Sequence, residues 1–357
     1  MTVKTVILAG GEGTRLRPLT INIPKAMVPV LNTPFLEHVI RHLRNHQLTD
    51  ITLTLGHLSP TIQTYFGDGS LFDIKLKYTV EDTPRGTAGA VKMAGKYLDG
   101  TFVVLNGDIY TTLDISAMLA FHREKKAKVT IALTPVADPT DYGLVETENS
   151  RVTRFVEKPT HDQITTNMIN AGTYILEPDI LQHIPPETNF SFERELFPML
   201  LKMREPVYAY PSTAYWIDIG TPEKYFRLHA DLLKGAETKV GEQSVIHPSV
   251  KIEGPVLIGA DCDIRQGVRI IGPTVIGASS TIRENAVVET SLLWRNVRVG
   301  PQVKLKNSII ADNCSLFYKS TINESILGDN VVVPSGVELE PGSKIWPRTM
   351  VSSVLKR

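Results

Sequence analysis

The first 235 positions alternate short apolar runs with amphipathic stretches of helical spacing. Runs of this length predict buried strands, and apolar residues at every third and fourth position predict helices. The predicted strands cover 3–9, 51–55, 74–79, 102–105, 128–135, 142–146, 152–156 and 169–176. The predicted helices cover 35–46, 58–66, 86–97, 113–125 and 223–234. Strands that alternate with helices predict an α/β fold with a mostly parallel, three-layer sheet covered on both faces.

After Gly235 the helical patterns stop, and an apolar residue recurs at every sixth position. The phase slips by single residues after Trp294, but the count continues to the end of the chain. Three such positions per triangular turn would give six turns of a parallel β-helix. Cys262 and other small or β-branched residues lie four positions after most of them, where a tight corner needs a small side chain. The recurring positions are Ile246, Ile252, Ile258, Ile264, Ile270, Ile276, Ile282, Val288, Trp294, Val299, Leu305, Ile310, Leu316, Ile322, Leu327, Val333, Leu339 and Ile345.

This period resembles the hexapeptide repeat of left-handed β-helices, and the expected handedness comes from that resemblance. The sequence therefore predicts two domains, an α/β domain over 1–236 and a left-handed parallel β-helix over 240–357.

The stretch from Ala9 to Pro29 joins a glycine-rich turn to two cations, Arg15 and Lys25. Glycine lets backbone N–H groups approach an anion closely, and the two side chains add a planar fork of donors and a point charge. The spacing fits neither the P-loop nor the dinucleotide-binding motif, because Leu16 stands three positions after Gly13. A phosphate-binding loop of another kind and a solvated glycine-rich turn with two surface cations are the interpretations that remain.

Composition restricts the class of protein further. Thirty-eight basic residues balance thirty-eight acidic ones, so no extended surface for nucleic acid or an anionic membrane is expected. Two cysteines, no apolar run of membrane-spanning length and a first strand that begins by Val3 favour a soluble cytoplasmic protein. His38, His42 and His46 follow one another at helical spacing, and we interpret them as a solvated helix face rather than a zinc site.

Carboxylates follow two of the apolar segments. Asp108 ends the stretch Val104-Leu105-Asn106-Gly107-Asp108, and Asp218 lies in an apolar segment between Trp216 and Gly220. Ligands of open α/β sheets bind at the carboxyl ends of the strands, where Gly10, Glu81 and Asp108 should lie together. A turn at Asp108 and a buried structural role for Asp218 are the competing interpretations.

The opening pattern GGxGTRLxPLTxxxPKxxxPV resembles that of the sugar-1-phosphate nucleotidylyltransferases, and the resemblance extends over nearly the whole chain. It continues in the segments VLNGD, FVEKP, INAG and WIDIGTPEKY. Among the branches of this family, mannose-1-phosphate guanylyltransferase is the most similar. Glucose-1-phosphate thymidylyl-, uridylyl- and adenylyltransferases are the alternative.

The resemblance implies a Rossmann-like catalytic domain and a Mg²⁺-dependent reaction of an NTP with a sugar 1-phosphate. It gives a catalytic role to the cations Arg15, Lys25 and Lys158, and metal binding to Asp108 and Asp218. The nucleotide would be bound by Leu8, Ala9, Gly10, Gly11, Gly13, Thr14, Glu81, Gly86 and Thr87. The sugar phosphate would be bound by Gly143, Glu157, Lys158, Asn170 and Gly172.

Two other classes of function were considered. An acyltransferase on the repeat domain would usually need a histidine base, and His247 is the only histidine in that segment. A non-catalytic regulatory relative would be expected to lack the cations or the aspartates, all of which are present. We therefore expect an enzyme with NTP and sugar 1-phosphate as substrates, no nucleic-acid or membrane partner, and self-association into a homo-oligomer.

Overall fold

The computed structural model describes residues 3–56 and 58–352. Contacts divide the chain into two compact units. Residues 1–12 and 36–218 form one of them, here called the sheet unit, and residues 13–35 and 219–357 form the other, here called the coil unit. The segment 13–35, which carries Arg15 and Lys25, therefore groups with the C-terminal part of the chain, although it is close in sequence to the first strand.

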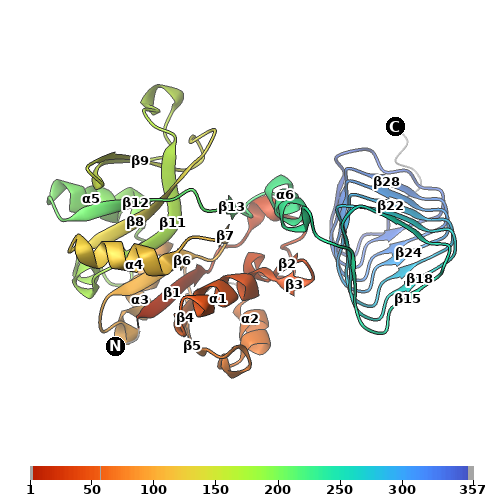
Figure 1. Cartoon of the computed structure of the whole chain (residues 1–357), viewed down its shortest axis with the longest axis horizontal. Coiled ribbons are helices and arrows are strands. Elements are labelled where there is room, and N and C mark those ends of the chain that lie inside the picture. The colour runs from red at the N-terminus through yellow and green to blue at the C-terminus, as the bar shows by residue number, and fades with distance from the viewer. Residues whose placement is uncertain (1–2, 57, 353–357) are drawn as a thin grey trace. The chain divides into compact units, whose positions relative to one another are not determined.

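A nine-stranded sheet forms the centre of the sheet unit, in the order β5-β4-β1-β6-β11-β8-β12-β10-β9 (Figure 1). A separate antiparallel pair, β7 with β13, lies in the same unit. The strands are β1 Lys4–Ala9, β4 Asp50–Leu55, β5 Lys75–Val80, β6 Phe102–Asn106, β7 Ile109–Thr111, β8 Val129–Pro135, β9 Gly143–Glu148, β10 Arg151–Glu157, β11 Met168–Leu176, β12 Val207–Pro211 and β13 Trp216–Asp218.

Helices cover both faces of this sheet, as predicted. The odd-numbered residues of β8 share a core with Ala88 and Val91 of α3, whereas the hydroxyl of Thr130 contacts His122 of α4 on the opposite face. The helices and short helical turns of the unit are α1 Phe35–Asn45, α2 Ser59–Phe66, η3 Ser70–Phe72, α3 Gly86–Ala94, η4 Gly95–Tyr97, α4 Ile115–Glu124, η5 His161–Gln163, η6 Pro178–His183, η7 Phe192–Leu196 and α5 Phe197–Lys202. Within the described part of the chain, no helix has the length and apolar character needed to cross a membrane.

The prediction of a mostly parallel sheet is correct for one half of the sheet only. Strands β5, β4, β1 and β6 run parallel, but β11 pairs antiparallel with both β6 and β8. Strands β9 and β10 are antiparallel because the two residues between them, Asn149 and Ser150, both have positive φ angles. Such two-residue turns join neighbouring antiparallel strands, and β9 with β10 is a hairpin of this kind. In the same half of the sheet, β12 runs parallel to β8.

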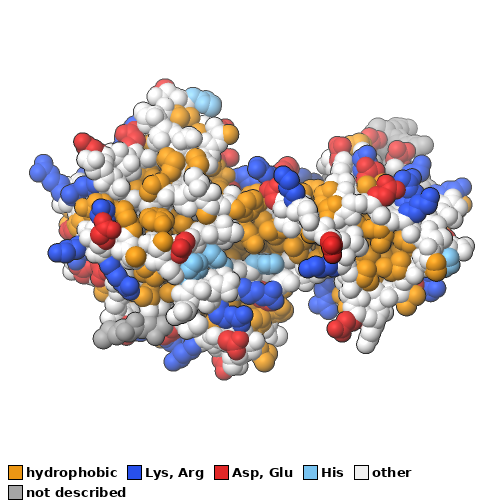
Figure 2. All heavy atoms as spheres, viewed as in Figure 1, with side chains coloured by type: hydrophobic (Ala, Val, Ile, Leu, Met, Phe, Trp, Pro, Cys, Tyr) orange, Lys and Arg blue, Asp and Glu red, His pale blue; other side chains and the backbone are white. Residues whose placement is uncertain are grey.

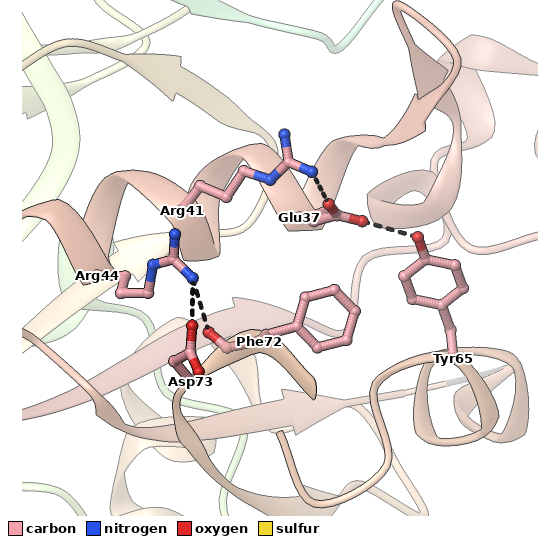
Figure 3. Close-up of polar contacts among 6 residues, drawn as sticks. All are labelled: Glu37, Arg41, Arg44, Tyr65, Phe72 and Asp73. Atoms are coloured by element: carbon pink, nitrogen blue, oxygen red, sulfur yellow. Dashed lines mark hydrogen bonds and ion pairs between the residues drawn. The ribbon is translucent and has the colours of Figure 1, made fainter. Parts of the chain in front are cut away.

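Polar contacts fix the exposed side of α1 to the segments around it (Figure 3). Glu37 is almost fully buried, and its carboxylate accepts hydrogen bonds from Arg41 and, at 2.7 Å, from the Tyr65 hydroxyl of α2. Arg44 forms an ion pair of 2.9 Å with Asp73, which follows η3. A buried carboxylate is tolerated here because both of its oxygen atoms have donors.

The coil unit begins with residues 13–35, here called the cation loop, and continues from α6 into a large β domain. The cation loop contains the turns η1 Thr14–Leu16 and η2 Lys25–Met27 and the small hairpin of β2 Pro29–Val30 and β3 Thr33–Pro34. The α6 helix, Pro222–Leu233, has Pro at its first position, and the side chain of Thr221 accepts the backbone N–H of Lys224, as expected for an N-cap.

The rest of the coil unit, here called the three-sheet domain, consists of short parallel strands in sheets of seven, six and five strands. The chain visits the three sheets in turn, as the stacked coils in Figure 1 show. The strands are β14 Lys239–Val240, β15 Val245–Ile246, β16 Lys251–Glu253, β17 Val256–Ile258, β18 Asp263–Ile264, β19 Arg269–Ile271, β20 Thr274–Ile276, β21 Thr281–Ile282, β22 Val287–Glu289, β23 Leu292–Leu293, β24 Arg298–Val299, β25 Lys304–Lys306, β26 Ile309–Ile310, β27 Ser315–Leu316, β28 Thr321–Asn323, β29 Ile326–Leu327, β30 Val332–Val333 and β31 Lys344–Ile345.

The core of the three-sheet domain consists mainly of the residues that recur at every sixth position. One position differs from the prediction, because Leu293 and not Trp294 belongs to this core. The repeat shortens by one residue before Trp294, and not after it as the sequence pattern indicates. Trp294 is nevertheless buried, at 3% exposure. Cys262 and Cys314 are buried, unpaired and part of the same core, in agreement with a packing role.

Replacing Leu305 with alanine is expected to lower the free energy of unfolding by about 2–5 kcal/mol, because the change leaves a cavity in a fully packed core. Leu305 is 1% exposed in the middle of β25. Denaturant titration followed by circular dichroism measures this loss. The neighbouring Lys304→Ala, on the exposed side of the same strand, is the control and is expected to change stability by about 0.5 kcal/mol or less. Equal effects of the two substitutions would contradict the inward position of Leu305.

Candidate functional site

The predicted nucleotide-binding residues of the sheet unit lie at one edge of its sheet. The parallel strands β1, β5 and β6 end at this edge and are followed by Gly10, Glu81 and Asp108 respectively. The backbone N–H of Gly107 donates to the carbonyl of Leu8 at 2.8 Å, which fixes the end of β6 against the end of β1. A Cβ on residue 107 would lie 2.7 Å from that same carbonyl oxygen, so glycine is required there.

The carboxylate of Glu81 lies beside Gly10, with Oε1 3.5 Å from the point that a Cβ on residue 10 would occupy. Its other oxygen, Oε2, accepts the backbone N–H of Arg85 at 2.8 Å. Burial raises the pKa of Glu81 above its ordinary value, and the contact with Arg85 opposes that shift. Glu81 is thus a half-buried acceptor held at the edge of the sheet, as the sequence predicts, whereas Asp82 is exposed.

The pairing of two short strands brings the backbone of Asp218 next to the segment that carries Asp108. In the antiparallel pair of β7 and β13, Asp218 lies opposite Ile109, the residue that follows Asp108. Asp218 is buried at 8% exposure, and Oδ2 accepts a hydrogen bond of 2.7 Å from the Tyr142 hydroxyl. Within the described residues, no group of three or more His, Cys, Asp and Glu side chains is placed to hold a metal ion. A cation at this point would have two carboxylates and would need further oxygen ligands from elsewhere.

Three of the predicted sugar-phosphate residues meet where β9 pairs with β10. Glu157 lies opposite Gly143 in the register of the two strands, and the backbone N–H of Lys158 donates to the carbonyl of Tyr142 at 2.9 Å. A Cβ on residue 143 would lie 2.6 Å from the Phe155 ring, so only glycine fits opposite this ring. Lys158 has a φ of 51° and an exposed side chain.

The two remaining sugar-phosphate residues, Asn170 and Gly172, belong to β11. The side-chain oxygen of Asn170 accepts the backbone N–H of Gly172 at 2.9 Å. Gly172 has a φ of 66°, and a Cβ there would lie 2.7 Å from Asn106 Nδ2, so the residue must be glycine. Asn170 Nδ2 donates to the hydroxyl of Tyr174 at 2.8 Å.

Sequence reasoning missed Tyr174 and Glu193, which connect the two predicted binding regions. The Tyr174 hydroxyl donates to Glu193 Oε1 at 3.0 Å, and the hydroxyl of Thr87 donates to Glu193 Oε2 at 2.8 Å. Asn170 is thereby linked to the start of α3 through two buried or half-buried groups. Burial is the main cause that raises the pKa of Glu157, and the negative charge of Glu193 adds to it. The segment Phe192-Glu193-Arg194-Glu195-Leu196 had a signal only as part of the family resemblance, since its periodicity does not separate a site residue from an exposed acid.

The cation loop lies in the coil unit and is itself tightly packed. Gly13 has a φ of 63°, and a Cβ there would lie 2.9 Å from the Cβ of Lys25. The hydroxyl of Thr20 donates to the carbonyl of Gly13 at 2.7 Å. Lys25 is 8% exposed, whereas Thr14 and Arg15 are exposed on the first turn of the loop. The structure therefore places Gly13 directly against Lys25, and the binding of an anion by this loop stays a prediction.

His42 and His46 of α1 contact each other and a neighbouring side chain. Among the described residues no ligand group of the necessary size includes them. The rings of His42 and His46 pack edge to face, with their centroids 4.9 Å apart. His46 Nδ1 lies 2.9 Å from the hydroxyl of Ser116. Burial and the neighbouring His46 lower the pKa of His42. His42 and His46 are half-buried, so the predicted solvated face is only partly correct.

Comparisons with known proteins cover both parts of the chain. The family model described as "Nucleotidyl transferase" matches residues 4–235, and the model described as "GMPPB C-terminal domain" matches residues 252–357. The chain is 37% identical over 276 residues to the mannose-1-phosphate guanylyltransferase of Mycobacterium tuberculosis, which covers 73% of this chain and 76% of the relative. It is 34% identical over 337 residues to the UTP–glucose-1-phosphate uridylyltransferase of Synechocystis, with 86% and 87% covered.

A solved structure is similar as well. The crystal structure of HddC from Yersinia pseudotuberculosis complexed with GMP-PN has a TM-score of 0.55 and 34% sequence identity to this chain. The similarity covers 63% of this chain and 97% of HddC. HddC is thus matched over almost its whole length, and the rest of this chain lies outside the similarity.

Proposed function

The chain belongs to the nucleotidyl transferase family, and on this premise we propose that it transfers GMP from GTP to mannose 1-phosphate, with GDP-mannose and pyrophosphate as products. The observation that carries this proposal is the arrangement at the sheet edge. There the Glu81 carboxylate lies beside Gly10, and the pairing of β7 with β13 places Asp218 opposite Ile109, the residue that follows Asp108. One carboxylate would bind the base and the other two would bind a cation.

In the proposed reaction an oxygen of the sugar phosphate attacks the α-phosphorus of the NTP. The bond from that phosphorus to the bridging oxygen breaks, and pyrophosphate leaves on the opposite side. No covalent intermediate with the protein is needed. Arg15, Lys25 and Lys158 would neutralise the two polyanions and hold them in line, so catalysis depends on positioning and electrostatic stabilisation.

The donor set at the sheet edge suits Mg²⁺. Two carboxylates from adjacent strands provide hard oxygen ligands, and Mg²⁺ in such sites usually completes its octahedron with phosphate oxygens and water. When bound, the ion would stabilise negative charge that develops on the phosphate oxygens. Tyr142 would keep the Asp218 carboxylate oriented through its hydrogen bond of 2.7 Å.

The remaining binding residues follow from their positions. The backbone of Leu8, Ala9, Gly10, Gly11, Gly13 and Thr14 would contact the nucleotide, since glycine at the ends of β1 leaves the backbone accessible. Gly86 and Thr87, at the start of α3, would contact the base or ribose. Gly143, Glu157, Asn170 and Gly172 would bind the sugar, with Glu193 and Tyr174 orienting Asn170 through their hydrogen bonds.

The choice of GTP is supported by chemistry and by the similar proteins. Guanine presents two adjacent donors, N1–H and the 2-amino group, which a carboxylate can accept together. One relative is named as a mannose-1-phosphate guanylyltransferase, and HddC was crystallised with GMP-PN. The Synechocystis relative is named as a uridylyltransferase for glucose 1-phosphate, and that activity is the second candidate.

A screen of pyrophosphate release with four NTPs and several sugar 1-phosphates tests the proposal. We expect GTP with mannose 1-phosphate to give the largest kcat/KM, and no turnover in excess EDTA. A larger kcat/KM with UTP or dTTP and glucose 1-phosphate would contradict the proposed specificity but not the nucleotidyl transfer. Absence of pyrophosphate release with every pair would contradict the enzymatic function itself.

For the three-sheet domain we propose the finer description of a left-handed β-helix built from hexapeptide repeats. Its support is the three parallel sheets that the chain visits in turn, with apolar residues at every sixth position in the core. We further propose self-association into a homo-oligomer and a cytoplasmic location. The location is supported by the two buried, unpaired cysteines, which suit a reducing compartment.

A further inference from the structure

The cation loop is joined to the three-sheet domain by two consecutive hydrogen bonds through Tyr225, one buried and one partly buried. Tyr225, on α6, is fully buried, and its hydroxyl accepts the indole N–H of Trp294 at 3.1 Å. The same hydroxyl donates to the backbone carbonyl of Pro29, four residues after Lys25. Trp294 is the residue that leaves the inward-facing series of the domain. Its indole is therefore directed to α6 and the cation loop instead of the core.

Two further contacts attach the loop to other coils of the domain. Asn32, in the turn between β2 and β3, donates to the carbonyl of Ile276 at 3.0 Å. Asn22, three residues before Lys25, donates to Asp329 Oδ2 at 3.2 Å. Asp329 is 8% exposed, and burial raises the pKa of its carboxyl.

The three contacts fall on one column of the domain. Ile276 pairs with Leu293, Leu293 with Ile310, and Ile310 with Leu327, so these residues stack from coil to coil. The contact residues on the domain are Ile276 itself, Trp294 next to Leu293, and Asp329 two positions after Leu327. The loop is thus fixed at separate points along several coils.

Contacts inside the compact loop fix the positions of its cations relative to the residues that contact the three-sheet domain. Gly13 packs against Lys25, and Thr20 bonds to the Gly13 carbonyl, so η1 and η2 are held against each other. A shift of Pro29 or Asn22 would therefore displace Lys25, and with it the turn that carries Arg15. A displacement of about 1 Å in a positioning group is enough to reduce turnover substantially.

We propose that the three-sheet domain positions the NTP-binding cations through Tyr225, Asn22 and Asn32, so that it forms part of the nucleotide-binding machinery. Tyr225 is then a positioning residue: it contacts no substrate and acts through Pro29 and the loop. This inference rests on the proposed function of Arg15 and Lys25. It assigns to the C-terminal domain a role in the affinity for NTP, in addition to self-association.

The first test is Tyr225→Phe in the full-length enzyme, which removes one oxygen atom and leaves the Trp294 indole N–H and the Pro29 carbonyl without their partner. We expect the KM for the NTP to rise about 5- to 100-fold, as the loss of a buried hydrogen-bond partner implies. The KM for the sugar 1-phosphate should change less than about twofold. Thermal unfolding is measured alongside, to separate an effect on the loop from loss of the folded protein.

Asp329 provides a matched pair of substitutions. Asp329→Asn keeps an oxygen that can accept from Asn22 and is expected to leave the KM for the NTP within about twofold of wild type. Asp329→Ala removes the acceptor and should raise that KM about 5- to 20-fold, as should the milder Asn22→Ala. All rates are measured with the NTP that the wild type turns over fastest, so the test remains informative even where GTP is not preferred.

The proposal is overturned if Tyr225→Phe, Asp329→Ala and Asn22→Ala all fold and keep the KM values for the NTP and the sugar 1-phosphate within twofold of wild type. This holds even if the variants have lower melting temperatures. Such a result would make the contacts structural only. Equal increases of both KM values would also contradict it, because the cation loop would then have no selective effect on the nucleotide. Failure of the proposed function is distinguished by the wild type, which would release no pyrophosphate with any substrate pair.

Discussion

Asp108→Asn and Asp218→Asn are each expected to lower kcat by a factor of about 100 to 1,000 or more, with the fold intact. In the β7–β13 pairing Asp218 lies opposite the residue that follows Asp108, and the proposed site needs both charges to hold Mg²⁺. An amide is neutral and a weak ligand for this ion, so the charge that stabilises the developing negative charge on the phosphates is lost. Losses of this size are typical when one electrostatic contact to a transition state is removed.

The measurement is the initial rate of pyrophosphate release over a range of Mg²⁺ concentrations, together with circular dichroism. Asp68→Asn is the matched control, since Asp68 is an exposed turn residue of the same unit that bonds to the backbone N–H of Ser70. It should leave the rate unchanged at every Mg²⁺ concentration. If both site variants keep most of the wild-type activity at limiting Mg²⁺, the two-carboxylate metal site is wrong.

Most elements of the chain could be predicted from the sequence because each has a clear period. The run before Gly10, the helical spacing over 35–46 and the period of six after 246 all indicate which side of an element is buried. The strand ends then place Gly10, Glu81 and Asp108 at one edge of the sheet without further information. The structure has all three residues at this edge of the sheet, as predicted.

The partners of each element could not be predicted, because periodicity shows burial and not contact. The antiparallel position of β11 between β6 and β8 pairs segments that are far apart in the sequence, so no local turn signal indicates it. The bond from Asn22 to Asp329 joins residues 307 positions apart, and nothing near either residue indicates it. Nothing in the sequence pattern indicates that residues 13–35 group with the C-terminal unit. The division into domains over 1–236 and 240–357 stays a prediction.

The irregular position of Trp294 in the repeat indicates a contact with another segment of the chain. A tryptophan at an inward position of a narrow core would be too large for its neighbours, and the structure relieves this by placing Leu293 inside. The indole then bonds to Tyr225 at 3.1 Å. The phase slip, which in the sequence is only an irregularity, thus marks the point where the repeat meets another segment.

Glu81→Gln is expected to narrow the preference for GTP over dTTP by a factor of about 10 to 100. Guanine offers two adjacent donors to the Glu81 carboxylate, whereas thymine and uracil offer one donor between two carbonyl acceptors. A charged hydrogen bond contributes about 1.5–3 kcal/mol, which corresponds to this range of the ratio of kcat/KM values. The position of the Glu81 side chain is fixed, because Oε2 accepts the Arg85 N–H and the carboxylate lies beside Gly10.

Asp82→Asn is the matched control, since Asp82 is the exposed acid next to Glu81 and should leave the ratio unchanged. The pH dependence gives a second readout. Burial raises the pKa of Glu81, so its carboxylate takes up a proton at higher pH than an exposed glutamate would. As the pH falls through that raised pKa, the GTP-to-dTTP ratio of the wild type should decline toward the ratio of Glu81→Gln, which should itself stay constant. Effects of pH that are common to both nucleotides cancel in the ratio. A wild-type enzyme that uses dTTP or UTP at least as efficiently as GTP would refute the base contact and the guanylyl specificity together, while the nucleotidyl transfer reaction would remain.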